Sequence, residues 1–125
     1  MSTMPSKTIK ITINTGAYQI GPVSPDTKVI LEAGYLFSKE GRAPIDEAFK
    51  VEDTDGRNRA ALSRIAQHVI VSWSVGETDR AAIEQFLLAL YDEDPLTASQ
   101  IIERLADRKR FGRPSLVDAE ALGEG

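Results

Sequence analysis

The densest group of chemically capable side chains lies in the segment DRKRFGRPS, residues 107–115, where a Gly-Arg-Pro step stands among cations. Basic arms of DNA-binding proteins share this step, but the AT-hook core has an arginine on both sides of the glycine, and Phe111 replaces the first one here. A helix that ends at Phe111-Gly112, with Pro114 beyond it, explains the charges, because cations in a last helical turn stabilise the negative end of the helix dipole. We favour this solvated helix end over a protein-docking patch, and such a patch over a nucleic-acid site.

The other residue types do not combine into a catalytic or metal-binding motif. The single histidine, His68, lacks ligand-like spacing around it, and the sequence contains no cysteine. The segment VEDTDG departs from a calcium loop, since Val51 and Leu62 stand where the first acid and the bidentate glutamate belong. Two carboxylate pairs fall in segments that we expect to be solvated loops, namely Asp46-Glu47 and Asp53/Asp55. We therefore expect a protein that is not an enzyme, with no catalytic residue, metal, nucleotide or other cofactor.

Composition narrows the class of protein. The 125 residues suffice for one hydrophobic core, and 42% hydrophobic with 27% charged residues is typical of a folded globular chain. The longest apolar run, FLLALY at 86–91, is far shorter than the roughly 20 residues that cross a bilayer. A net charge of −4 argues against a surface built for nucleic acid. We therefore expect a cytoplasmic protein without membrane contact.

The first half of the sequence predicts a β-hairpin and little other regular structure. Isoleucines alternate with polar residues from Ile9 to Ile13, and after the turn NTG the same period returns at Tyr18 and Ile20, so the hairpin spans residues 7–20. A short helix capped by Ser24 is favoured next, although Val29-Ile30 alone suits a strand. The segment SKEGRAPID predicts a loop, and residues 49–51 a short strand.

The second half predicts three helices. Apolar residues recur at helical spacing from residue 57 to a core tryptophan, Trp73, and again from 79 to 91, where Ile83, Phe86, Leu87 and Leu90 share a face. In LTASQI, Thr97 and Gln100 have the spacing of a capping box, and Leu96 and Ile101 that of a hydrophobic staple. In this third helix the inward positions are Ile101, Ile102 and Leu105.

These elements predict an α+β fold, with an N-terminal β-hairpin followed by a mainly α-helical domain of three to four helices. We expect residues 1–114 to form this single domain and residues 115–125 to be a flexible or short amphipathic tail. The basic helix end and the apolar residues of the tail are the candidate partner-binding residues, Arg104, Arg108, Lys109, Arg110, Phe111, Arg113, Leu116, Val117 and Leu122.

The order of elements resembles the tail assembly chaperones of long-tailed bacteriophages. The motifs that carry the resemblance are PVSPDTKVILEAG, IAQHVIVSW and PLTASQIIERL, within residues 7–110. It implies a short hairpin that leads into a helix within the first motif, a central helix ending in the tryptophan, and a Thr-capped last helix, in a protein located in the host cytoplasm if it is phage-encoded. The helical segment VGETDRAAIEQFLLALYDED departs from the family, which has a shorter linker there. The implied activity is non-catalytic: the protein coats the tape-measure protein and aids assembly of tail-tube subunits, and a homo-oligomer is possible.

A second class of function stays open at this point. The chain could be a small phage or bacterial regulatory or inhibitor protein that docks on a host protein or nucleic acid through the basic helix end. The dependence of partner binding on salt concentration distinguishes a nucleic-acid-binding protein from the assembly chaperone. Binding to several phosphates weakens steeply as the salt concentration rises, whereas an apolar contact does not.

Deletion of residues 115–125 tests the candidate partner-binding residues of the tail. A segment this short is not stable as an isolated helix, so it needs a surface to lie on. We expect the truncated chain to stay folded but to lose self-association or binding to an elongated helical partner, measured by light scattering and pull-down. Unfolding would place the tail in the core, and unchanged binding would place the interaction surface elsewhere.

Overall fold

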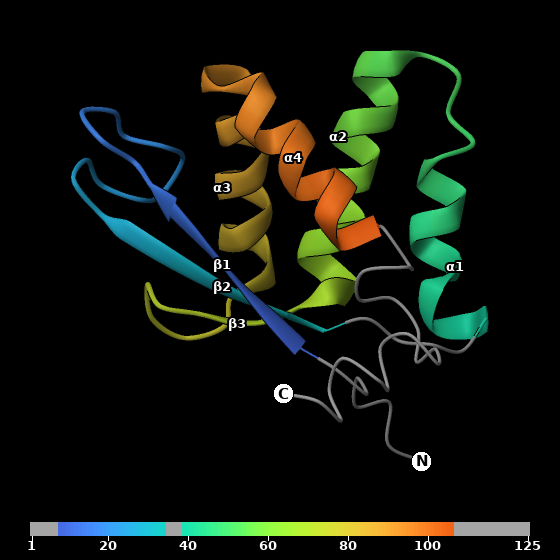
Figure 1. The fold of residues 1–125 in the computed structure, drawn as a ribbon, viewed down its shortest axis with the longest axis horizontal. Coiled ribbons are helices and arrows are strands. Elements are labelled where there is room, and N and C mark those ends of the chain that lie inside the picture. Colours follow the sequence, from blue (N-terminus) through green and yellow to red (C-terminus); the bar gives the residue numbers. More distant parts are fainter. Residues whose placement is uncertain (1–7, 35–38, 107–125) are drawn as a thin grey trace, which may run out of the picture.

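The computed structural model describes residues 8–34 and 39–106, which form an α+β fold with an N-terminal β-hairpin and a helical region, as predicted. In Figure 1 the helices stand on one side of a three-stranded antiparallel sheet. The elements in chain order are β1 (Thr8–Asn14), β2 (Lys28–Gly34), α1 (Lys39–Ala48), α2 (Thr54–Arg64), a π-helical turn (Ile65–Val69), β3 (Ile70–Trp73), α3 (Arg80–Glu93) and α4 (Pro95–Ala106).

The sheet has the order β1-β2-β3, so β2 is its central strand. The register of β1 and β2 is unbroken from the pair Thr8 and Gly34 to the pair Asn14 and Lys28. β3 pairs with the other side of β2, and an irregularity between Glu32 and Ala33 shifts that register. Alternate side chains of β1 and β2 point into the core, which confirms the period of two in β1, and these are Ile11, Ile13, Val29, Leu31 and Ala33.

The partner strand of the hairpin is not the predicted one. Residues 18–20 do not pair with β1, and Tyr18 is 61% exposed. The segment predicted to begin a helix at Ser24 instead forms a turn, in which Asp26 has φ of +57°, and then enters β2. The reason is tertiary: β2 supplies a complete apolar face opposite β1, which neither Tyr18 nor a single helical turn can supply.

The long connection between β1 and β2 is held by a buried hydroxyl and by contact with α3. The Thr15 hydroxyl donates to the Ser24 carbonyl (3.0 Å) and accepts from the Thr27 amide (2.9 Å). Ile20 and Val23 are buried and pair with each other in an isolated bridge. Between them, Gly21 has φ of +56°, and a Cβ there would lie 2.9 Å from the Gln85 carbonyl oxygen of α3. Glycine is therefore required at this close approach.

Residues 39–51 also differ from the sequence prediction. The expected loop SKEGRAPID contains most of α1, which includes Pro44, and the expected strand at 49–51 is absent. Ile45 and Ala48 are buried and α1 packs on α2, so tertiary burial outweighs the cost of a proline inside a helix. The amides of residues 49–51 donate back to carbonyls of residues 45–48, which closes the end of α1 as a turn.

The helix predicted for residues 57–73 begins earlier and ends earlier. α2 starts at Thr54, and after the π-helical turn the chain becomes β3 instead of continuing to Trp73 as a helix. The Arg80 guanidinium donates to the carbonyls of Ala66 (3.0 Å) and Ile70. Because the helical turn ends at Val69, no further helical amide is available to donate to these carbonyls. Trp73 is buried as predicted, and its indole donates to the Glu77 carbonyl (2.9 Å).

The last two helices follow the sequence more closely. α3 is capped by Asp79, whose carboxylate accepts from the amides of Ala81 and Ala82. α4 begins at Pro95, so Thr97 is not its N-cap, and Leu96 is 69% exposed instead of forming a staple. The inward positions predicted for both helices are confirmed as buried, and these are Ile83, Phe86, Leu87, Leu90, Ile101, Ile102 and Leu105.

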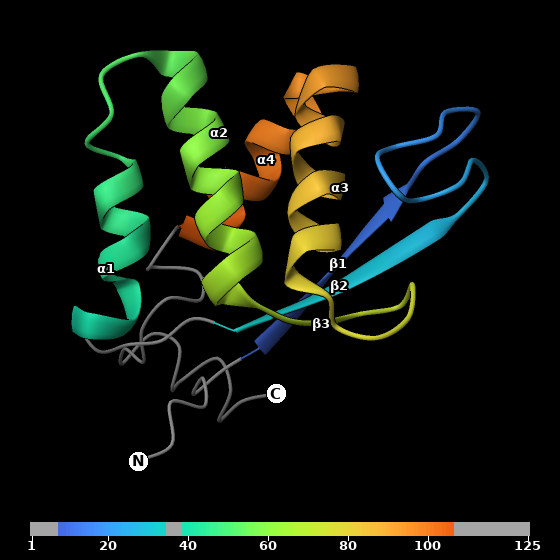
Figure 2. The ribbon, with the colours of Figure 1, turned by 180° about the vertical axis from the view of Figure 1, so that it is seen from behind.

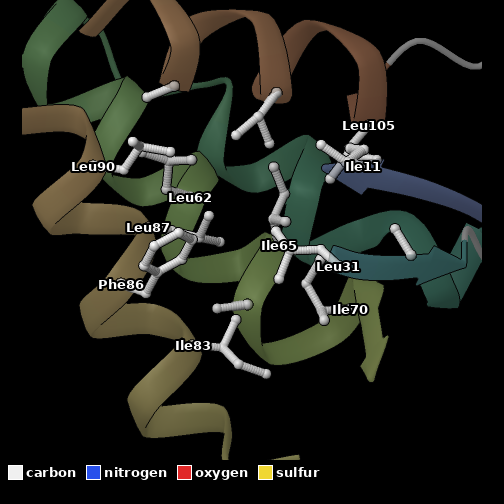
Figure 3. Packing of buried hydrophobic residues seen from close by; sticks show 14 of the residues in the cluster. Ile11, Leu31, Leu62, Ile65, Ile70, Ile83, Phe86, Leu87, Leu90 and Leu105 are labelled. Atoms are coloured by element: carbon white, nitrogen blue, oxygen red, sulfur yellow. The ribbon is translucent and has the colours of Figure 1, made fainter. Parts of the chain in front are cut away.

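One hydrophobic core joins the sheet to all four described helices. From behind, Figure 2 shows α1, α2 and α3 side by side, with α4 crossing them on the far side. Residues from these helices and from the sheet converge in Figure 3, where Leu31, Leu62, Ile65, Phe86 and Leu105 are labelled. The described residues thus share a single core, while the predicted boundary at residue 114 lies outside them.

Two leucines of α4 provide a matched test of this packing. Leu105 is fully buried, so Leu105→Ala should lower the free energy of unfolding by about 2–5 kcal/mol, and Trp73→Ala should have a similar effect. Leu96→Ala makes the same substitution at an exposed position of the same helix and should stay within about 0.5 kcal/mol of wild type. Chemical denaturation measures all three, and equal midpoints for the two leucine variants would show that the assigned face of α4 is wrong.

Candidate binding surface

Of the nine candidate partner-binding residues, the structure describes one. Arg104 lies in the last turn of α4 with its side chain exposed. The other eight fall outside the described residues, as does the predicted glycine cap at Gly112, so their grouping into a surface stays a prediction. These residues are Arg108, Lys109, Arg110, Phe111, Arg113, Leu116, Val117 and Leu122.

The described side chains that were considered as catalytic or metal-binding residues either have structural roles or do not group with other such residues. His68 is exposed on the π-helical turn, and partial burial, followed by the charges of Arg64 and Arg80, holds its pKa below the ordinary value of 6.5. No group of three or more metal-ligating side chains occurs within residues 8–34 and 39–106. None of the described helices is long and apolar enough to span a membrane.

The carboxylates that were expected in loops lie on helices. Asp46 and Glu47 belong to α1, and Asp53 caps α2, where its carboxylate accepts from the Gly56 amide (2.7 Å). Asp55 occupies the first turn of α2 and pairs with Arg59 (3.0 Å). The sequence prediction missed these roles because it did not predict α1 and started α2 three residues too late.

Arg59 connects the start of α2 with the end of α3. Its guanidinium also pairs with Asp92 (2.6 Å) and lies 5.0 Å from the centre of the Tyr91 ring. The hydrogen bond that Arg59 donates to Asp55 is the main cause that keeps the pKa of Asp55 below 3.8. The hydrogen bonds that Arg59 donates to Asp92 and Asp55 raise the pKa of Arg59. These exposed charges position two helix ends, and sequence spacing could not reveal a pair 33 residues apart.

A hollow of about 260 Å³ lies between the β1–β2 connection and the end of α3. Its wall includes the exposed Tyr18 ring and two carboxylates, Glu93 and Asp94. The Asp94 carboxylate accepts from the Thr97 hydroxyl (2.6 Å) and amide (3.2 Å), and these bonds hold its pKa below 3.8. Asp94 is therefore committed to starting α4, three residues before the predicted cap.

The two edges of the sheet differ, and the edge formed by β3 is partly covered by its own chain. Residues 74–80 turn back past β3, where the Thr78 hydroxyl donates to the Val71 carbonyl (3.5 Å) and Arg80 donates to the Ile70 carbonyl. The bond between the Trp73 indole and the Glu77 carbonyl ties this segment down. Such cover protects an edge strand from pairing with another chain.

The opposite edge, on the outer side of β1, is open in the described part of the molecule. The Thr15 amide donates to the Thr27 carbonyl (3.0 Å), so the alternation of an antiparallel ladder points the backbone groups of Ile9, Ile11 and Ile13 toward β2. The amides and carbonyls of the intervening residues then point away from β2. These residues are Thr8, Lys10, Thr12 and Asn14, whose side chains are all exposed. We call these outward backbone groups the β1 edge.

No family model matches the chain, and no curated protein or solved structure is significantly similar to it. The function is therefore inferred from the described residues and their geometry. Among these features, the β1 edge is a row of hydrogen-bonding groups that no described residue satisfies.

The role of Asp94 predicts a pH-dependent loss of stability. Because its folded-state pKa is lowered, its contribution is fully present above about pH 3.8 and disappears as the pH falls through the folded-state value. Asp94→Ala should therefore lower the denaturation midpoint at pH 7, and the gap to wild type should close in strong acid. Glu93→Ala, which removes the neighbouring carboxylate, is the control and should not destabilise. A gap that persists unchanged at low pH would mean that the charge does not contribute.

Proposed function

We propose that this protein is a non-catalytic assembly factor that binds other proteins, and that the β1 edge is where an extended partner segment docks. The observation that carries the proposal is the difference between the two sheet edges: Thr78 and Arg80 bond to two carbonyls of β3, while β1 presents its outward groups along seven residues. Natural proteins commonly shield or interrupt an edge of this kind, because it is a template for pairing with another chain.

The chemistry of the β1 edge fits strand addition. An added strand would satisfy the amides and carbonyls of four alternate residues, which supplies affinity without requiring a particular partner sequence. The side chains around these groups are small and polar except for Lys10, so they leave the backbone accessible on the solvent face. The opposite face of β1 is already packed into the core, which fixes the strand before a partner arrives.

The motifs that resemble phage tail assembly chaperones support a protein-binding role in part. PLTASQIIERL forms a helix, α4, but Thr97 is not its N-cap, although the resemblance implies that it is. VSPDTKVILEAG forms a turn and β2, and IAQHVIVSW includes the π-helical turn and ends in β3. The proposal therefore depends on the β1 edge, and the resemblance selects the first partners to test. These are the tape-measure and tail-tube proteins of long-tailed bacteriophages.

Thr12→Pro tests the β1 edge directly. Proline removes an amide that points away from β2, so it blocks strand addition while leaving the β1–β2 ladder bonded. Loss of one or two hydrogen bonds should weaken partner binding by about tenfold or more, measured by calorimetry with the purified tape-measure or tail-tube protein.

Thr12→Val is the matched control, because it keeps the amide and the β-branched shape at the same position. It should bind as wild type does, and circular dichroism should show both variants folded. Equal affinity of Thr12→Pro and Thr12→Val for a partner that wild type binds would remove the β1 edge from the interaction.

A further inference from the structure

We propose that one partner of the β1 edge is a second copy of this chain, joined by antiparallel pairing of two β1 strands around a twofold axis at Ile11. This inference rests on the proposed function, because it names an occupant for the same edge. Three observations favour a second copy as the occupant. They are the direction of the backbone groups of β1, the match of its side chains, and the cover on the β3 edge.

The backbone groups of two β1 edges are complementary only in certain registers. Antiparallel pairing requires outward residues to lie opposite outward residues, and in β1 these are the even-numbered positions. A register centred on Ile11 meets this requirement. It pairs Thr8 with Asn14 of the second copy and Lys10 with Thr12, so all seven residues of β1 take part. A shift by two residues in either direction leaves two residues of each strand unpaired.

The side chains favour the same register. On the solvent face, Lys10 is the only charged residue of β1, and centring on Ile11 places it opposite Thr12 instead of opposite its own counterpart. Centring on Lys10 would set two like charges directly opposite each other, which is destabilising. On the core face, Ile9 lies opposite Ile13 and Ile11 opposite Ile11, and Ile11 and Ile13 are already buried within one copy. Ile9 is only half-buried within one copy, so pairing covers its remaining apolar surface.

The cover on β3 explains why such pairing would close into a dimer. A twofold axis uses the same edge of both copies and joins two three-stranded sheets into one of six strands. The outer edges of that sheet are the two β3 strands, where Thr78 and Arg80 already bond to the carbonyls of Val71 and Ile70. These bonds oppose the addition of a further strand, so pairing through β1 favours a closed dimer over a fibre.

Amide hydrogen exchange of the wild-type chain at several concentrations distinguishes the occupants of the β1 edge. With a second copy, the amides of Lys10 and Thr12 should be protected at high concentration and exchange faster on dilution. The amides of Ile11 and Ile13 donate toward β2 and should stay protected throughout, while sedimentation velocity follows the matching change from dimer to monomer.

Two results would overturn the second-copy proposal. One is a chain that remains a monomer at every concentration. The other is concentration-independent protection of Lys10 and Thr12 in the monomer, which would show that this chain covers its own edge. If wild type is a monomer but Thr12→Pro still abolishes binding of another protein, the second-copy proposal fails and the proposed function stands. If Thr12→Pro changes neither association nor partner binding, both fail.

Cysteine cross-linking tests the register, because the natural sequence contains no cysteine. A mixture of Lys10→Cys and Thr12→Cys chains should form more disulfide-linked dimer under mild oxidation than either variant alone, since the two positions face each other across the axis. Thr12→Cys chains that cross-link by themselves as readily as the mixture would overturn the register centred on Ile11.

Discussion

The architecture depends on the pairing of β2 with a strand on each side. β2 holds β1 along its whole length and β3 along a shorter, shifted register, and its inward residues Val29, Leu31 and Ala33 are fully buried beneath the helices. Because both sides of β2 are used, the sheet has its two edges on β1 and β3. The distribution of free hydrogen-bonding groups on the surface follows from that order.

Arg80 makes the second pairing of β2 possible. The apolar residues that follow α2 could have continued the helix, yet the chain passes through a π-helical turn and becomes a strand. Arg80, from the first turn of α3, donates to carbonyls before and at the start of β3, and Trp73 packs 6.1 Å from Phe86 of the same helix. One helix therefore stabilises both the end of α2 and the position of β3, and the returning segment partly covers the β3 edge. The β1 edge, in contrast, has no such bonds from the described residues.

The charged residues of the described part mainly serve helix ends. The carboxylates of Asp53, Asp79 and Asp94 accept hydrogen bonds from backbone amides at the starts of α2, α3 and α4. Arg59 links Asp55 to Asp92. Thr15, the one buried polar residue in the described part, is fully engaged in the β1–β2 connection. The β1 edge differs from these sites because its groups belong to the backbone and are satisfied by no described residue. The proposed role in binding rests on this difference.

The sequence by itself determined the features that depend on residues close in the chain. The alternation of Ile9, Ile11 and Ile13 predicted the two faces of β1, and helical spacing predicted the buried faces of α3 and α4, because these periods are local geometry. The α+β class followed from the same patterns. What the sequence could not decide was which segments meet.

Only the tertiary structure decided β2, β3 and α1. Val29-Ile30 suits a helix or a strand until β1 lies beside it, and Trp73 closes an apolar stripe that fits a helix but pairs with Leu31, 42 positions away, as a strand. Pro44 suggests a loop until burial of Ile45 against the helical layer outweighs it. The candidate binding surface shows the same division: the sequence directed attention to the cations and apolar residues of 104–122, whereas the β1 edge emerged only once the strand order showed which backbone groups were left without a partner.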